Sequence, residues 1–150
     1  MIRAGFFTLL LFIISLPIYA ADNENDKFST PWLTANKSHQ YLGLGAIALG
    51  ALTAIVPKPE EDNYKDSLHR KLALSATYLG GAALGTGFVF HYKDLSLHHL
   101  FRNPDNLHAL FATIGTLGFL VAVNAAPNES HITPGLVGLA GMVTAVKITW

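Results

Sequence analysis

Four apolar stretches, separated by short polar connections, constrain the fold of this chain more than any other feature. They cover residues 40–56, 72–90, 107–123 and 132–150. Each has roughly 17 to 19 residues, and a helix that begins one turn earlier would span a hydrocarbon core of ~30 Å. Because the connections 57–69, 91–103 and 124–130 are short, consecutive helices should be antiparallel neighbours. The pattern predicts an all-α integral membrane protein, built as an up-and-down four-helix bundle.

Composition supports a membrane protein and excludes several other classes. The chain is 51% hydrophobic and 13% charged, whereas soluble domains usually carry about 25% charged residues. The net charge is zero and no basic–aromatic motif occurs, so we expect no nucleic-acid partner. Because there is no cysteine, disulfides, Cys-ligated iron–sulfur clusters and covalent haem attachment are excluded. The four stretches hold no Asp, Glu or Arg, which argues against an ion-coupled transporter.

The N-terminus has the features of a cleavable signal peptide, assigned to residues 1–21. Arg3 precedes an apolar core at 6–16, and the small pair Ala20-Ala21 precedes a polar segment. An uncleaved anchor is the alternative, and both leave residues 22–38 as an extracytoplasmic segment before the transmembrane domain 39–150. We therefore expect a multi-pass protein, in the cytoplasmic (inner) membrane if the chain is bacterial, with its mature N-terminus outside.

The basic residues partly support and partly oppose an orientation with the N-terminus outside. Four of them lie in or beside the first connection, which would be inside, and they fit the positive-inside rule: Lys58, Lys65, Arg70 and Lys71. Five others would lie outside and count against it: Lys27, Lys37, Lys93, Arg102 and Lys147. We give the signal peptide more weight than the charge count.

Capping residues predict where each helix begins. The first could open at Thr30-Pro31, with Ser38 as a later alternative, and the second at Asp66 or Ser67. Asn103-Pro104 has the cap-then-proline form and predicts the third start. For the fourth helix Ser130 and Thr133 are alternatives, and in the second case His131 lies just outside the helix.

One histidine stands at the beginning of each apolar stretch: His39, His69, His108 and His131. Successive helices of an up-and-down bundle start on opposite faces, and its first and third helices, like its second and fourth, lie diagonally across the core. His39 should therefore face His108 near the outer membrane face, and His69 should face His131 near the inner one. Two imidazoles can fill both axial positions of a haem iron. A lone histidine at such a position is commonly only an interfacial residue, but four in alternation favour two bis-histidine b haems.

A small residue follows each of these histidines after four positions: Gly43, Ala73, Ala112 and Gly135. Residues four apart lie on nearly the same helix face. A large side chain there would strike the plane of a macrocycle bound to the histidine. We therefore add these four residues to the predicted haem-binding set.

The second connection carries further polar residues that could meet an electron donor or a redox partner. Lys93, His98, His99 and Arg102 would lie outside, near the outer haem. They could bind an anionic or quinol-like reductant or dock a protein, and His98 or His99 could replace His108 as a ligand. A solvated loop with incidental histidines is the alternative.

The layout of residues 38–150 resembles the cytochrome b561 family, on the four histidines, their small partners and the glycine-rich stretches. The resemblance implies a four-helix core with two b haems, ligated by His39, His69, His108 and His131, that moves electrons across a membrane. It implies a donor such as ascorbate or quinol, or a redox protein partner. Many members have additional helices, and no clear ascorbate-binding motif occurs here.

Two other functions compete with this hypothesis. One is a haem-free accessory or assembly subunit that packs through its glycine faces, and the other is a mono-haem, quinone-linked subunit. The small extramembrane mass suggests a subunit of a larger complex or a homodimer. Whether the chain is an enzyme or only an electron carrier is left open.

Overall fold

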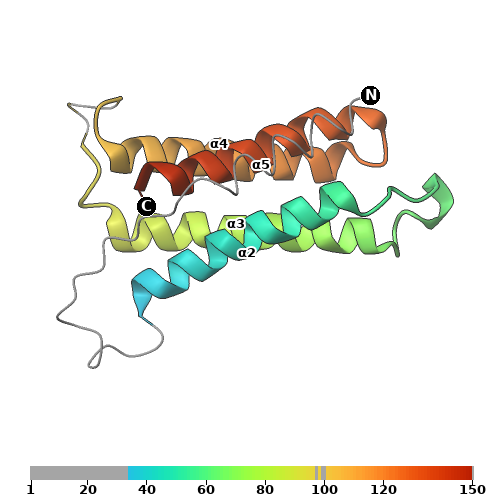
Figure 1. The fold of residues 1–150 in the computed structure, drawn as a ribbon, viewed down its shortest axis with the longest axis horizontal. Coiled ribbons are helices and arrows are strands. Elements are labelled where there is room, and N and C mark those ends of the chain that lie inside the picture. Colours follow the sequence, from blue (N-terminus) through green and yellow to red (C-terminus); the bar gives the residue numbers. More distant parts are fainter. Residues whose placement is uncertain (1–33, 97, 99–100, 150) are drawn as a thin grey trace.

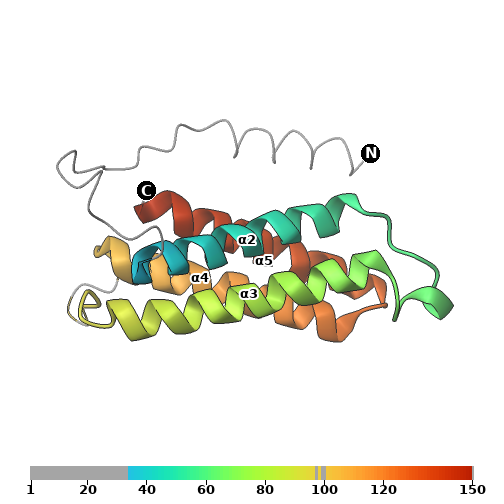
Figure 2. The same ribbon diagram turned by 90° about the horizontal axis from the view of Figure 1, so that it is seen from below.

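A computed structural model describes residues 34–96, 98 and 101–149, and every regular element within them is a helix (Figure 1). The four long helices are α2 (Ala35–Ile55), α3 (Leu68–His91), α4 (Pro104–Ala125) and α5 (Ile132–Thr149). Two short 3₁₀ turns, η2 (Glu61–Asn63) and η4 (Glu129–His131), lie in the connections. The helices run alternately up and down (Figures 1 and 2), as predicted. The predicted signal peptide 1–21 and most of segment 22–38 lie outside the described residues.

Polar caps define the first three helix starts. Thr34 caps α2, accepting a hydrogen bond from the Lys37 backbone N–H at 3.2 Å. Ser38 was wrong as an alternative, because its hydroxyl donates to the Thr34 carbonyl from inside the helix. Thr30-Pro31 falls outside the described part of the chain. Ser67 caps α3 and Asn103 caps α4, with proline following at its first position, both as predicted.

The last helix begins differently from both predicted alternatives. The η4 turn continues directly into α5 at Ile132, so neither Ser130 nor Thr133 is its N-cap. Pro134 falls in the first turn, where its missing N–H costs no intrahelical hydrogen bond. His131 consequently lies just before α5, in a turn rather than in the helix.

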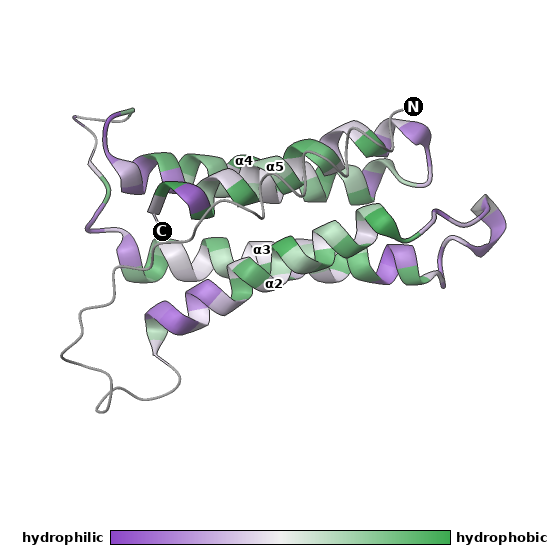
Figure 3. Ribbon diagram, in the orientation of Figure 1, coloured by the Kyte–Doolittle hydropathy of each residue, from purple (hydrophilic) through white to green (hydrophobic). Residues whose placement is uncertain are grey.

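Three segments in the described part of the chain are long and apolar enough to cross a membrane: α3, α4 and Glu129–Thr149. The α2 helix has 21 residues, but its first turns are polar, with the run Asn36 to Gln40, and it falls short of the same criterion. Hydrophobic residues run along the middles of the helices, and hydrophilic ones gather at helix ends and loops (Figure 3). On the outer surface Tyr78 is 73% exposed and Val89 67%. Such an apolar exterior fits a multi-pass membrane protein.

The helices close into a ring in which neighbours along the chain are neighbours in space. The main interfaces are α2 with α3 and α4 with α5, and contacts of α3 with α4 and α2 with α5 complete the ring. Thus α2 lies diagonally opposite α4, and α3 opposite α5. We call the end where α2 and α4 begin the His39 end, and the end where α3 and α5 begin the His69 end.

Glycines set the distance between α4 and α5. A Cβ added to Gly118 would lie 2.6 Å from the Gly138 Cα, and one added to Gly141 would lie 2.9 Å from the Gly115 Cα. Backbone therefore packs against backbone, which is a common way to join helices in membranes. The buried cluster at mid-bundle combines small residues with a few large ones: Ala46, Ala76, Phe119, Leu139 and Met142.

We predict that Gly118→Ala destabilises the protein while Gly85→Ala does not. The new methyl at position 118 would collide with the α5 backbone, at a cost of about 1–3 kcal/mol. The methyl at position 85 would meet open space, and alanine is the better helix former by up to about 1 kcal/mol. Thermal unfolding of the two variants in detergent measures the difference, and equal melting temperatures would contradict the packing described here.

Candidate functional site

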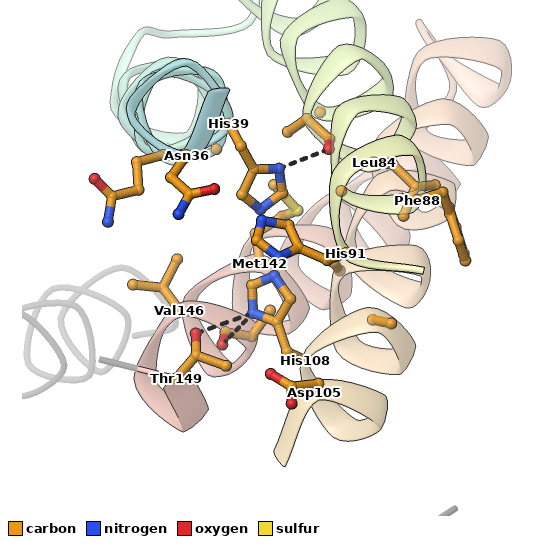
Figure 4. Close-up of a pocket in the computed structure, with 18 of the residues that line it drawn as sticks. Asn36, His39, Leu84, Phe88, His91, Asp105, His108, Met142, Val146 and Thr149 are labelled. Atoms are coloured by element: carbon orange, nitrogen blue, oxygen red, sulfur yellow. Dashed lines mark hydrogen bonds between the residues drawn. The ribbon is translucent and has the colours of Figure 1, made fainter. Parts of the chain in front are cut away.

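The four predicted histidines form two pairs, each joining diagonal helices. His39 of α2 faces His108 of α4 with ring centroids 5.8 Å apart (Figure 4). His69 of α3 faces His131, at the start of α5, with centroids 6.0 Å apart. Because α2 and α4 begin at one end and α3 and α5 at the other, the pairs lie at opposite ends of the bundle. The structure thus brings together the residues that the sequence analysis had paired.

At the His39 end, both rings are held by main-chain carbonyls of a neighbouring helix. His39 Nδ1 lies 3.0 Å from the Ala83 carbonyl oxygen and 3.2 Å from the Thr86 hydroxyl. His108 Nδ1 lies 2.8 Å from the Ala145 carbonyl and 3.2 Å from the Thr149 hydroxyl. The rings are therefore fixed by α3 and α5, the helices between which the pair is placed.

At the His69 end both rings also bond main-chain carbonyls, one at the end of α2 and one in the turn that contains His131. His69 Nδ1 lies 3.0 Å from the Val56 carbonyl, just past the end of α2, and His131 Nδ1 bonds the Asn128 carbonyl. Both side chains are buried, each 9% exposed. Tyr64, from the connection after α2, is also buried and has its ring centroid 6.4 Å from that of His69. Burial raises the pKa of this tyrosine, and nearby Arg70 partly offsets the effect, so the phenol is neutral at pH 7.

These hydrogen bonds determine which ring nitrogen is free. A carbonyl oxygen can only accept, so each of the four Nδ1 atoms must carry the proton. In the neutral imidazole the lone pair then resides on Nε2, the atom available to a metal. Histidines that bind metals nearly always donate the other N–H to a carbonyl, carboxylate or water. All four rings therefore have the carbonyl acceptor on Nδ1 that is typical of histidines that bind a metal through Nε2.

A cavity of about 220 Å³ lies around the His39–His108 pair (Figure 4). Its wall includes two of the predicted small residues, Gly43 and Ala112. A Cβ added to Gly43 would meet nothing within 4 Å, so this glycine borders open space. At the other end, a Cβ on Gly135 would lie 3.5 Å from the Ala122 Cβ, in ordinary contact. Ala73 is partly buried on α3, one helical turn beyond His69.

A haem fits this donor set better than a bare metal ion does. No group of three or more His, Cys, Asp or Glu side chains in the described residues is placed to hold a metal. A haem supplies four ligands itself and needs only two imidazoles. With metal–nitrogen bonds of about 2 Å, two imidazoles on one metal have ring centroids roughly 6 Å apart. Both observed separations match that value.

The predicted donor surface is placed near this site without lining it. Lys93, His98 and Arg102 are exposed, and the Lys93 ammonium lies 5.7 Å from the Tyr92 ring centroid. None of these three residues borders the cavity. His99 falls outside the described residues. The polar part of the cavity wall comes from elsewhere: Asn36, Gln40, His91, Asp105 and Thr149.

Sequence reasoning missed the residues that position the rings. The carbonyls of Ala83, Ala145, Val56 and Asn128 carry no signal in the sequence, since every residue has one. Gly87 was also missed: a Cβ there would lie 3.0 Å from His39 Cε1, so the glycine makes room for the imidazole. Tyr64, an aromatic residue in a polar connection, was a sequence signal that this connection packs against the bundle.

We predict that Gly87→Val weakens haem binding at the His39 end, whereas Gly85→Val on the same helix does not. The valine would push the His39 ring off the Ala83 carbonyl, and loss of the hydrogen bond that orients a ligating imidazole costs about 10-fold or more in affinity. Titrating haemin into each purified apo-protein and following absorbance gives the two affinities. Unchanged binding in Gly87→Val would show that this contact does not hold the ring.

No protein-family model matches this chain, and no curated protein or solved structure matches it. The resemblance to the cytochrome b561 family therefore stays a prediction, based on the histidine positions and their small neighbours.

Proposed function

We propose that this protein is a b-type cytochrome that transfers electrons across a membrane through two bis-histidine haems. One observation carries the proposal: two histidine pairs span the bundle diagonally at its opposite ends, each ring with Nδ1 bonded to a main-chain carbonyl. His39 and His108 would hold one haem, and His69 and His131 the other. When bound, a haem supplies a one-electron iron couple.

The separation of the two pairs suits transfer across a bilayer. The α2 helix leads from His39, in one pair, to Val56, whose carbonyl bonds His69 of the other. At about 1.5 Å per residue this path is roughly 25 Å long, close to the ~30 Å of a hydrocarbon core. Each haem would therefore lie near one membrane face, within reach of a partner on that side. The proposal requires α2 to span the membrane with the other three helices.

The protein residues favour electron transfer over chemistry at the iron. With two imidazoles as ligands, no coordination position is left for oxygen or a substrate. The Nδ1 hydrogen bonds orient both rings and raise their basicity.

We place the His39 end outside, where a mature N-terminus after a signal peptide would lie. The cavity at that end borders Asn36, Gln40 and Thr149, whose polar groups suit the propionates of a haem or an incoming reductant. A quinol, another small reductant or a redox protein would deliver electrons there, and the protein could act as a subunit of a larger complex. A mono-haem subunit is the second candidate, favoured by the cavity seen around the His39–His108 pair.

Counting haems in single variants tests the ligand assignment. We expect about two haems per chain in the wild type, and the loss of about half in His39→Ala and in His69→Ala, because each pair is independent. His98→Ala, an exposed histidine, is the matched control and should keep both. The measurements are the reduced-minus-oxidised spectrum and the pyridine haemochrome assay on detergent-purified protein.

Each other outcome has a definite meaning. One haem, lost only in His39→Ala, would select the mono-haem subunit. If the protein folds but contains no haem when it is produced with haem available, the cytochrome proposal is wrong. This result would leave the haem-free accessory subunit.

Transfer across the membrane needs its own test. In vesicles with ferricyanide trapped inside, a membrane-impermeant reductant added outside should bleach the ferricyanide if wild-type protein is present. His69→Ala and His39→Ala should each abolish this, because either variant removes one of the two relay positions. If ferricyanide is still bleached in His69→Ala vesicles that do not leak, a two-haem path is excluded.

A further inference from the structure

A fifth histidine, His91, lies beside the His39–His108 pair and is not used by the proposed electron path. It is the last residue of α3 and lines the same cavity. The ring centroid of His91 lies 5.7 Å from that of His39. The ring centroid of His108 lies 5.8 Å from that of His39. Both rings are inclined by 59° to the His39 ring. Figure 4 shows the three imidazoles in this cavity.

His91 is also prepared as a ligand in the same manner as the other histidines. Its Nδ1 lies 3.1 Å from Asp94 Oδ2, so a proton on Nδ1 has an acceptor and Nε2 is left free. A carboxylate acceptor orients a ligating imidazole and raises its basicity. Because His91 ends its helix and its side chain is 39% exposed, it can shift more easily than a residue in the middle of the bundle.

We propose that His91 is a second partner for His39. A metalloporphyrin held by His39 can then take its other axial imidazole from His91 as well as from His108. This inference rests on the proposed function and adds that the two ends of the bundle are unequal. At the His69 end, the described residues bring only His69 and His131 together.

Carbon monoxide distinguishes the two situations. A ferrous haem with two imidazoles has no free position, whereas one with a single imidazole can bind the gas. If His91 can replace His108, the variant His108→Ala keeps six-coordinate iron at the His39 end. Removing both histidines must then open that site.

The experiment uses the full chain, purified in detergent, with haem content and CO difference spectra measured for each variant. His108→Ala should retain the wild-type haem content and wild-type, near-zero CO binding. The double variant His91→Ala/His108→Ala should lose the haem of this end or bind about one CO per chain. His131→Ala, at the end without a spare imidazole, is the matched control and should lose its haem or bind CO.

The outcomes separate this inference from the proposed function. CO binding or haem loss in His108→Ala, with two haems in the wild type, overturns the inference alone. So does a double variant that keeps six-coordinate iron, because another residue then supplies the ligand. A wild type without haem overturns both. Should His108→Ala not fold, His108→Asn takes its place, since its amide nitrogen occupies the position of Nδ1 and can still donate to the Ala145 carbonyl.

Discussion

The hydrogen bond from an imidazole Nδ1 to a main-chain carbonyl is the interaction on which the candidate site depends. A polar ring in an apolar bundle is costly unless its N–H finds an acceptor. Helical carbonyls are already bonded along their own helix, but they have a second lone pair, and Ala83 and Ala145 use it for His39 and His108. The bond both satisfies the ring and presents Nε2 to the bundle interior. One contact thus satisfies the buried ring and would orient it for the proposed ligation.

Small residues make this contact possible. The Ala145 carbonyl is within reach of His108 because α4 and α5 approach through Gly115, Gly118 and their partners on α5. Gly87 leaves room for the His39 ring beside α3, so that the ring can reach the Ala83 carbonyl. Because α2 packs closely on α3 and α4 on α5, fewer side chains fill the space between these two helix pairs, where the histidines meet. In such a bundle a bound macrocycle would complete the core as well as carry electrons, so that haem and fold would stabilise each other.

The sequence predicted the number of helices, their order and the starts of α3 and α4, because hydrophobic length and capping residues are local signals. It also paired the histidines correctly, since up-and-down topology places helix starts alternately at two ends. It erred at the start of α5, where a 3₁₀ turn runs into the helix and no side chain marks the boundary. The polar first turns of α2 make it less apolar than its neighbours, although it contacts both α3 and α5 and so completes the ring.

What the sequence determined by itself was the set of chemically able groups: four histidines at alternating helix starts, small residues one turn later, and no competing thiol or intramembrane carboxylate. These follow from residue identity and periodicity. Only the tertiary structure decided which nitrogen each ring presents, which loop residues stay outside the cavity, and that His91 joins His39 and His108. Those features depend on how close two backbones come and on carbonyls that every residue possesses. Neither the distance between two backbones nor the position of a carbonyl can be read from the identity of the local residues.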